Sequence, residues 1–111
     1  MANYKLEKEV KNRMDRELKQ YYDNRAKLDR LKASLINNNS SRSLLYIEER
    51  LHYVENTYNR LKPYEQEVFK LIFKDQCNPI YCETMKNIGR STYYNVYNKC
   101  LYYLAEEWGE I

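Results

Sequence analysis

The sequence predicts an all-α protein, on the basis of its turn residues and its apolar pattern. Glycine and proline number only two each among 111 residues, which argues against a turn-rich β fold. Apolar residues recur at steps of three and four along most of the chain, as on one face of a helix. We expect a long, coiled-coil-like antiparallel helical hairpin in residues 1–62, followed by a three-helix helix-turn-helix unit in residues 63–111.

The first predicted helix covers about residues 4–36, a stretch without glycine or proline. Its apolar stripe consists of Leu6, Val10, Met14, Leu18, Tyr21, Leu28, Leu31 and Leu35. A polar loop over residues 37–43 follows it, and Ser43 suits the N-cap of the next helix.

The second predicted helix has a regular heptad seam and ends at Pro63. The seam consists of Leu44, Ile47, Leu51, Val54, Tyr58 and Leu61. Two helices joined by a short loop fold most simply into an antiparallel hairpin. Because the first helix is longer than the second, we expect its unpartnered end to fray or to pair with a second chain. The sequence therefore predicts a homodimer formed through the N-terminal helices.

Three further helices are predicted in the C-terminal half. The first begins at Pro63 and ends near Asp75, with an apolar face made of Val68, Phe69, Leu71, Ile72 and Phe73. The next begins at Asn78–Pro79 and is expected to turn Ile80, Cys82 and Met85 inward. The last runs from Arg90 to about Glu107 and ends at Gly109, with an inner stripe of Tyr93, Tyr97, Cys100, Leu101, Leu104 and Trp108. Tyr102 and Tyr103 are expected to pack rather than to form an exposed partner patch.

Residues 85–95 carry the pattern of a helix-turn-helix. Asn87 tolerates the left-handed backbone that the tight turn requires, and Ile88 supplies an apolar plug. Gly89 or Ser91 can cap the helix that follows. The first turn of that helix suits a phosphate or a base edge, since a helix N-terminus favours negative charge.

The outer face of the last helix is the predicted DNA-binding surface. If Tyr93 and Tyr97 point inward, the side chains on the opposite face point outward. Arg90 is expected to contact a guanine edge or a phosphate, Asn95 an adenine, and Tyr94 a thymine methyl group or a phosphate. The alternative is an ordinary solvated helix surface. The complete set of predicted DNA-binding residues, with two phosphate-contacting lysines, is Lys86, Arg90, Ser91, Thr92, Tyr94, Asn95, Asn98 and Lys99.

Charge is distributed unevenly. Residues 1–62 carry fourteen basic and nine acidic residues, whereas residues 63–111 carry five basic and seven acidic residues. Between Lys86 and Leu104, however, there are three basic residues and no acidic one. The basic residues of the hairpin form either a solvated face or contacts to flanking phosphates.

Composition argues against catalysis, metal binding and a membrane location. One histidine and two glycines exclude most catalytic constellations and phosphate-binding loops. Cys77, Cys82 and Cys100 match no common zinc spacing, so we expect reduced thiols and no metal or cofactor. There is neither a membrane-length apolar run nor an apolar signal-peptide core, which predicts a cytoplasmic protein.

Three segments resemble region 4 of sigma-70-type factors, and most of all the ArpU/RinA-like phage late-gene transcriptional activators. They are residues 61–73 (LKPYEQEVFKLIF), 85–94 (MKNIGRSTYY) and 101–105 (LYYLA), so the resemblance covers about residues 61–108. It implies a sigma-like helix-turn-helix in which Arg90, Ser91, Thr92, Tyr94 and Asn95 contact DNA. It also implies a phage or mobile-element activator of late promoters, with RNA polymerase as a partner.

The predicted function is therefore transcriptional regulation through binding of double-stranded DNA. Two alternatives remain. A DNA-packaging recognition subunit of the small terminase type also joins a helix-turn-helix to a coiled coil, and would form a ring of many chains. A helical protein–protein interaction module would not bind DNA at low salt.

Overall fold

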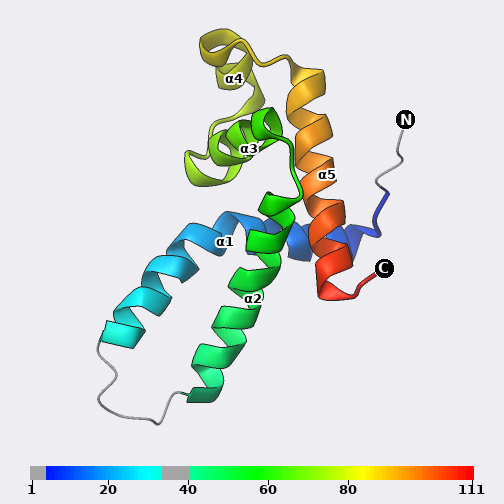
Figure 1. Ribbon diagram of the computed structural model, residues 1–111. Helices are drawn as coiled ribbons and strands as arrows, with labels where there is room; N and C mark the ends of the chain where they lie inside the picture. Colours follow the sequence, from blue (N-terminus) through cyan, green and yellow to red (C-terminus); the bar gives the residue numbers. More distant parts are fainter. Residues whose placement is uncertain (1–4, 34–40) are drawn as a thin grey trace.

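The computed structural model describes residues 5–33 and 41–111, and every element in these ranges is helical (Figure 1). The helices are α1 (Lys8–Ala33), α2 (Ser41–Asn59), α3 (Pro63–Phe69), α4 (Pro79–Lys86) and α5 (Arg90–Trp108), with a short π-helical segment, η2 (Lys70–Lys74), directly after α3. The predicted all-α class, with a helical hairpin followed by a helix-turn-helix unit, is confirmed.

The helices α1 and α2 form the hairpin. Two ion pairs cross it in antiparallel order: Lys32–Glu48 at 2.9 Å, near the connection, and Arg25–Glu55 at 2.6 Å, farther from it. The predicted bounds need correction, because α1 begins at Lys8 rather than near residue 4. The helix α2 begins at Ser41, so Ser43 lies within it and is not its N-cap. Leu35 and the predicted loop residues 37–40 lie outside the described ranges.

The N-terminal half of α1 packs against α5 and η2 rather than projecting from the hairpin. Met14 and Leu18 are completely buried. The Tyr97 hydroxyl of α5 donates a hydrogen bond to Asp15, and Arg13 forms an ion pair with Glu110. The expectation that one end of α1 lacks an intramolecular partner is therefore wrong, because α5 covers that end. The greater length of the first helix therefore does not support dimerisation.

A hydrophobic core extends across the predicted boundary at residue 62. It joins Leu18 of α1 and Val54 of α2 to residues of α3, η2, α4 and α5. Phe69 is 1% exposed, and its ring centroid lies 5.3 Å from that of Tyr58 and 4.9 Å from that of Phe73. The hairpin and the C-terminal helices are thus held together by shared apolar packing.

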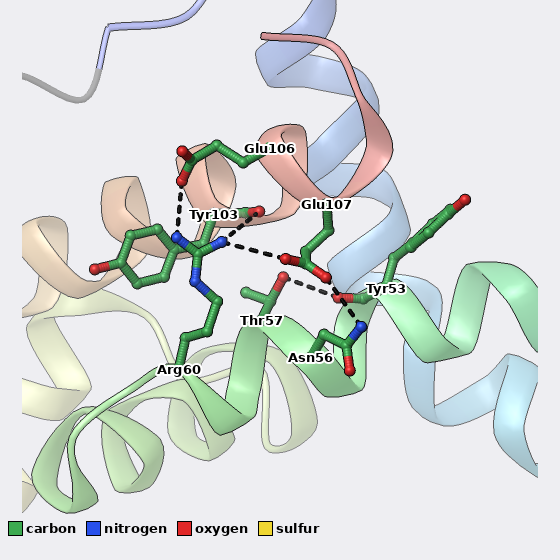
Figure 2. A network of polar contacts seen from close by, with 7 residues as sticks. All are labelled: Tyr53, Asn56, Thr57, Arg60, Tyr103, Glu106 and Glu107. Carbon is green, nitrogen blue, oxygen red and sulfur yellow. Dashed lines mark hydrogen bonds and ion pairs between the residues drawn. The ribbon is translucent and has the colours of Figure 1, made fainter.

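Polar contacts fasten the end of α2 to the end of α5 (Figure 2). The Arg60 guanidinium lies 2.9 Å from a Glu106 oxygen and 3.4 Å from a Glu107 oxygen, and it covers the Tyr103 ring at 3.9 Å. Asn56 donates a hydrogen bond to Glu107 at 2.9 Å. These contacts, together with α1, hold the C-terminal half of α5. Its N-terminal half extends away from the hairpin toward α4 (Figure 1).

The segment from α3 to η2 follows its prediction closely. Pro63 occupies the first helical position, and the Lys62 backbone N–H donates to Glu65 at 2.8 Å in a capping box. The last turn widens into a π-helix, in which the Asp75 N–H donates to the Lys70 carbonyl, and it ends where the sequence predicted. Leu71 is only half-buried, whereas the other predicted apolar residues of this segment are buried.

Candidate nucleic-acid interface

The turn between α4 and α5 has the geometry that its sequence predicts. Asn87 adopts a left-handed conformation with φ 55° and ψ 32°, and the Ile88 N–H donates to the Cys82 carbonyl at 3.0 Å. Such a bond closes the C-terminus of a helix. Gly89 is the N-cap of α5, with an extended backbone, so the choice between Gly89 and Ser91 falls on Gly89.

Buried contacts hold the two helices of this unit at a fixed angle. Cys82 of α4 is completely buried, Val96 of α5 is 2% exposed, and Ile88 packs on the same core. The Tyr93 hydroxyl donates to the Cys77 carbonyl at 3.1 Å and so ties α5 to the segment before α4. Burial raises the pKa of the Tyr93 hydroxyl and of the Cys82 thiol, which keeps both groups protonated at neutral pH.

Two apolar residues of α4 do not face the core as expected. Ile80 is 62% exposed and Met85 is 64% exposed, whereas Cys82 is completely buried. Ile80 lies on the side of α4 opposite Cys82. With Tyr81, which is also exposed, Ile80 and Met85 form a surface that we call the α4 apolar face. The inner side of α5 also differs from prediction, since Val96 is buried and Tyr97 and Trp108 are half-buried.

The outer face of α5 is exposed at most of the predicted positions. Ser91, Tyr94 and Asn95 are exposed beside Arg90, and Lys86 is exposed at the end of α4. Thr92 and Asn98 are half-buried. Residues 90, 91, 94, 95 and 98 therefore lie along one side of the helix, as the spacing predicted.

Lys99 is a correction to the predicted site. Its ammonium group lies 2.8 Å from a carboxylate oxygen of Glu65 in α3, and the two side chains are only 17% and 5% exposed. The buried carboxylate requires a cationic partner, and Lys99 supplies it. Lys99 thus points toward α3 and not toward the outer face of α5, where a phosphate contact was predicted.

Arg90 also contacts a carboxylate, but at the surface. Its Nε atom lies 3.2 Å from Glu83 of α4, and the two side chains are 60% and 49% exposed. Helical spacing did not predict the contact between Glu83 and Arg90. The seven-residue separation across a left-handed turn gives no periodic signal for such a pair.

Among the side chains that the structure describes, several hairpin cations form ion pairs with carboxylates of the same chain. These are Arg13, Lys19, Arg25, Lys32, Arg50 and Arg60. Arg50, for example, donates two hydrogen bonds to Glu17, at 2.7 and 3.0 Å. For these six residues, the structure favours a role in the charged surface of the fold over contact with phosphates.

The left-handed turn gives a first testable prediction. Asn87→Ala should destabilise the protein by about 1 kcal/mol, because a Cβ-bearing residue without a side-chain amide is strained at positive φ. Asn87→Gly is the matched control and should be neutral or slightly stabilising. Thermal unfolding of the two variants measures the difference, and equal melting temperatures would contradict the left-handed assignment.

No protein-family model, curated protein or solved structure matches this chain. The resemblance to sigma-70 region 4 and to ArpU/RinA-like activators therefore stays a prediction. Within residues 5–33 and 41–111, no helix is both long enough and apolar enough to cross a membrane. The same ranges contain no cluster of three or more side chains suited to holding a metal ion.

Proposed function

We propose that the protein binds double-stranded DNA through the N-terminal half of α5 and regulates transcription. The observation that carries this proposal is the exposed outer face of α5, which begins directly after the left-handed turn at Asn87 and to which α5 contributes no acidic residue before Glu106. A helix presented in this way fits the major groove, where its first turns meet base edges.

Each exposed group on this surface has a chemical role toward DNA. The planar guanidinium of Arg90 matches the two acceptors on a guanine edge, and the Asn95 amide matches the donor and acceptor of adenine. Tyr94 offers a hydroxyl to a phosphate or a ring to a thymine methyl group. Lys86 lies at the end of α4, where a phosphate contact positions the protein without specifying sequence.

The finer proposal follows from the resemblance. It is a phage or mobile-element activator that acts at late promoters in the bacterial cytoplasm and contacts RNA polymerase. A homodimer formed through the N-terminal helices would present two copies of α5 to one promoter. Two linked recognition helices would bind one site together, which compensates for the weak DNA attraction expected of a single copy of residues 63–111, whose formal charge is negative.

Salt dependence tests the general proposal. The affinity for a duplex of arbitrary sequence should fall steeply as salt rises, because binding displaces counterions from phosphates. A fluorescence-anisotropy titration at several salt concentrations measures this slope. Absence of binding at low salt, or binding insensitive to salt, would contradict DNA recognition.

Arg90→Ala should weaken binding to a selected specific duplex by roughly 1–3 kcal/mol without changing helicity. The expected loss comes from the guanine edge that the guanidinium contacts. Lys27→Ala is a matched control, since Lys27 is an exposed cation in the half of α1 that lies far from the start of α5 (Figure 1). Equal affinities of the two variants would show that Arg90 does not contact DNA.

A protein–protein interaction module is the second candidate, favoured by the α4 apolar face. Exposed apolar side chains that adjoin on one helix are typical of partner surfaces. Duplex binding by the unaltered protein at low salt separates the two candidates, and an Ile80→Ser/Met85→Ser variant checks that such binding does not use the α4 apolar face. A regulator that reads DNA through α5 should retain salt-dependent duplex binding in this variant, whereas an interaction module should show no duplex binding even as the unaltered protein.

A further inference from the structure

We propose that Glu83 is a positioning residue that orients Arg90 toward a guanine and so sets sequence specificity. This inference rests on the proposed function. It starts from the contact between Arg90 Nε and Glu83 Oε2 at 3.2 Å. A guanidinium carries five N–H donors in a rigid fork. This ion pair places the Nε side of the guanidinium beside the carboxylate, and the two terminal amino groups remain available for DNA.

Those two amino groups are the ones that a bidentate guanine contact uses. Guanine presents N7 and O6 as neighbouring acceptors in the major groove, and arginine reads them with two parallel N–H groups. An arginine held only by its flexible stem can also contact a phosphate or a different base. An ion pair at the Nε side restricts the guanidinium and favours the orientation that suits guanine.

The fold places the two partners together across the turn. Glu83 lies on α4 next to Cys82, which is completely buried, and Arg90 is the first residue of α5. The left-handed turn at Asn87 and the hydrogen bond from Ile88 to Cys82 fix the separation between the two helices at this point. The contact between Arg90 and Glu83 therefore joins two helices and is not a contact between neighbouring turns of one helix.

The negative charge of Glu83 lowers the general affinity for DNA, whereas its contact with Arg90 increases sequence specificity. An exposed ion pair contributes little while both side chains face water, at 60% and 49% exposure. A duplex that excludes water strengthens the pair, but it also brings the Glu83 carboxylate toward the phosphates. Removal of Glu83 should therefore increase non-specific binding and decrease discrimination at one base pair. A residue that only screens charge would not produce opposite effects on these two quantities.

The test is selection of bound sequences from a pool of duplexes with a randomised central segment. The full-length protein, Glu83→Ala, Arg90→Ala and Glu67→Ala are compared on the same pool and on one fixed duplex of arbitrary sequence. Glu67 is a matched control, since it is an exposed carboxylate on α3 that pairs with Lys70 rather than with a predicted DNA contact. Thermal melting of each variant checks that it folds.

We expect the unaltered protein to enrich a site that contains one strongly preferred guanine. Glu83→Ala should bind the fixed duplex more tightly, while its preference for that guanine falls at least about fivefold. Arg90→Ala should lose the preference at the same base pair. Glu67→Ala should keep it, whatever the change in general affinity.

Three outcomes would overturn the inference. If the unaltered protein binds no duplex at low salt, the proposed function itself fails. If it selects a site but Glu83→Ala keeps the same guanine preference, DNA binding stands and the positioning role fails. If Glu83→Ala and Glu67→Ala both increase affinity equally and neither changes base preference, Glu83 acts only as a general negative charge.

Discussion

Phe69→Ala should destabilise the protein by roughly 3–5 kcal/mol, the range for removal of a fully buried aromatic side chain. Phe69 is 1% exposed and packs against Tyr58 from α2 and Phe73 from η2. Its removal would leave a cavity where the hairpin and the C-terminal helices meet. The unfolding midpoint in urea, with the slope of the transition, measures the loss.

Tyr64→Ala is the control for this prediction. Tyr64 is an aromatic residue of the same helix but is 57% exposed, so its truncation should change stability little. A Phe69→Ala variant as stable as Tyr64→Ala would contradict the shared core. A two-step unfolding transition of the unaltered protein would show instead that the two halves unfold separately.

Lys99→Ala is expected to have the next largest effect, about 3 kcal/mol of lost stability. Removal of one partner leaves the Glu65 carboxylate buried without its cation, and the value lies at the low end of the usual range because Lys99 retains some exposure. Lys99→Met/Glu65→Gln should recover much of the loss, since glutamine keeps the capping role without a charge. A double variant no more stable than Lys99→Ala would contradict the pairing.

The same pair predicts a pH dependence. Burial alone would raise the pKa of Glu65, but hydrogen bonds from Lys99 and from the Lys62 backbone hold the pKa of this carboxyl below its ordinary value. The associated stability is therefore present above about pH 4.5 and is lost as the pH falls through the folded-state pKa. Thermal melting between neutral and acid pH should show a drop that is smaller in Lys99→Met/Glu65→Gln.

The helices and the turn could be predicted from the sequence because their signals are local. Apolar periodicity located the elements, Pro63 and Gly109 marked helix ends, and Asn87 marked the left-handed turn. The packing partners of these elements could not be predicted in the same way. No local pattern shows that the N-terminal half of α1 is covered by α5, because that contact joins residues about eighty positions apart.

At the candidate site, too, local spacing predicted which residues share a face but not which distant residues they contact. Helical spacing placed Arg90, Tyr94 and Asn95 on one exposed side of α5. It also placed Lys99 there, because spacing alone does not include the buried Glu65 that attracts its ammonium group. Ile80 was expected to be buried because it is apolar, but α4 is too short to bury two sides and Cys82 takes the inner one.

The most direct test of DNA recognition by α5 is a titration of isotope-labelled protein with a duplex, followed residue by residue through amide chemical shifts. We predict that the largest changes at low salt lie between residues 86 and 98 and diminish as salt is added. Changes confined to α1 and α2, or no change at any residue at low salt, would contradict the proposal that the outer face of α5 binds DNA.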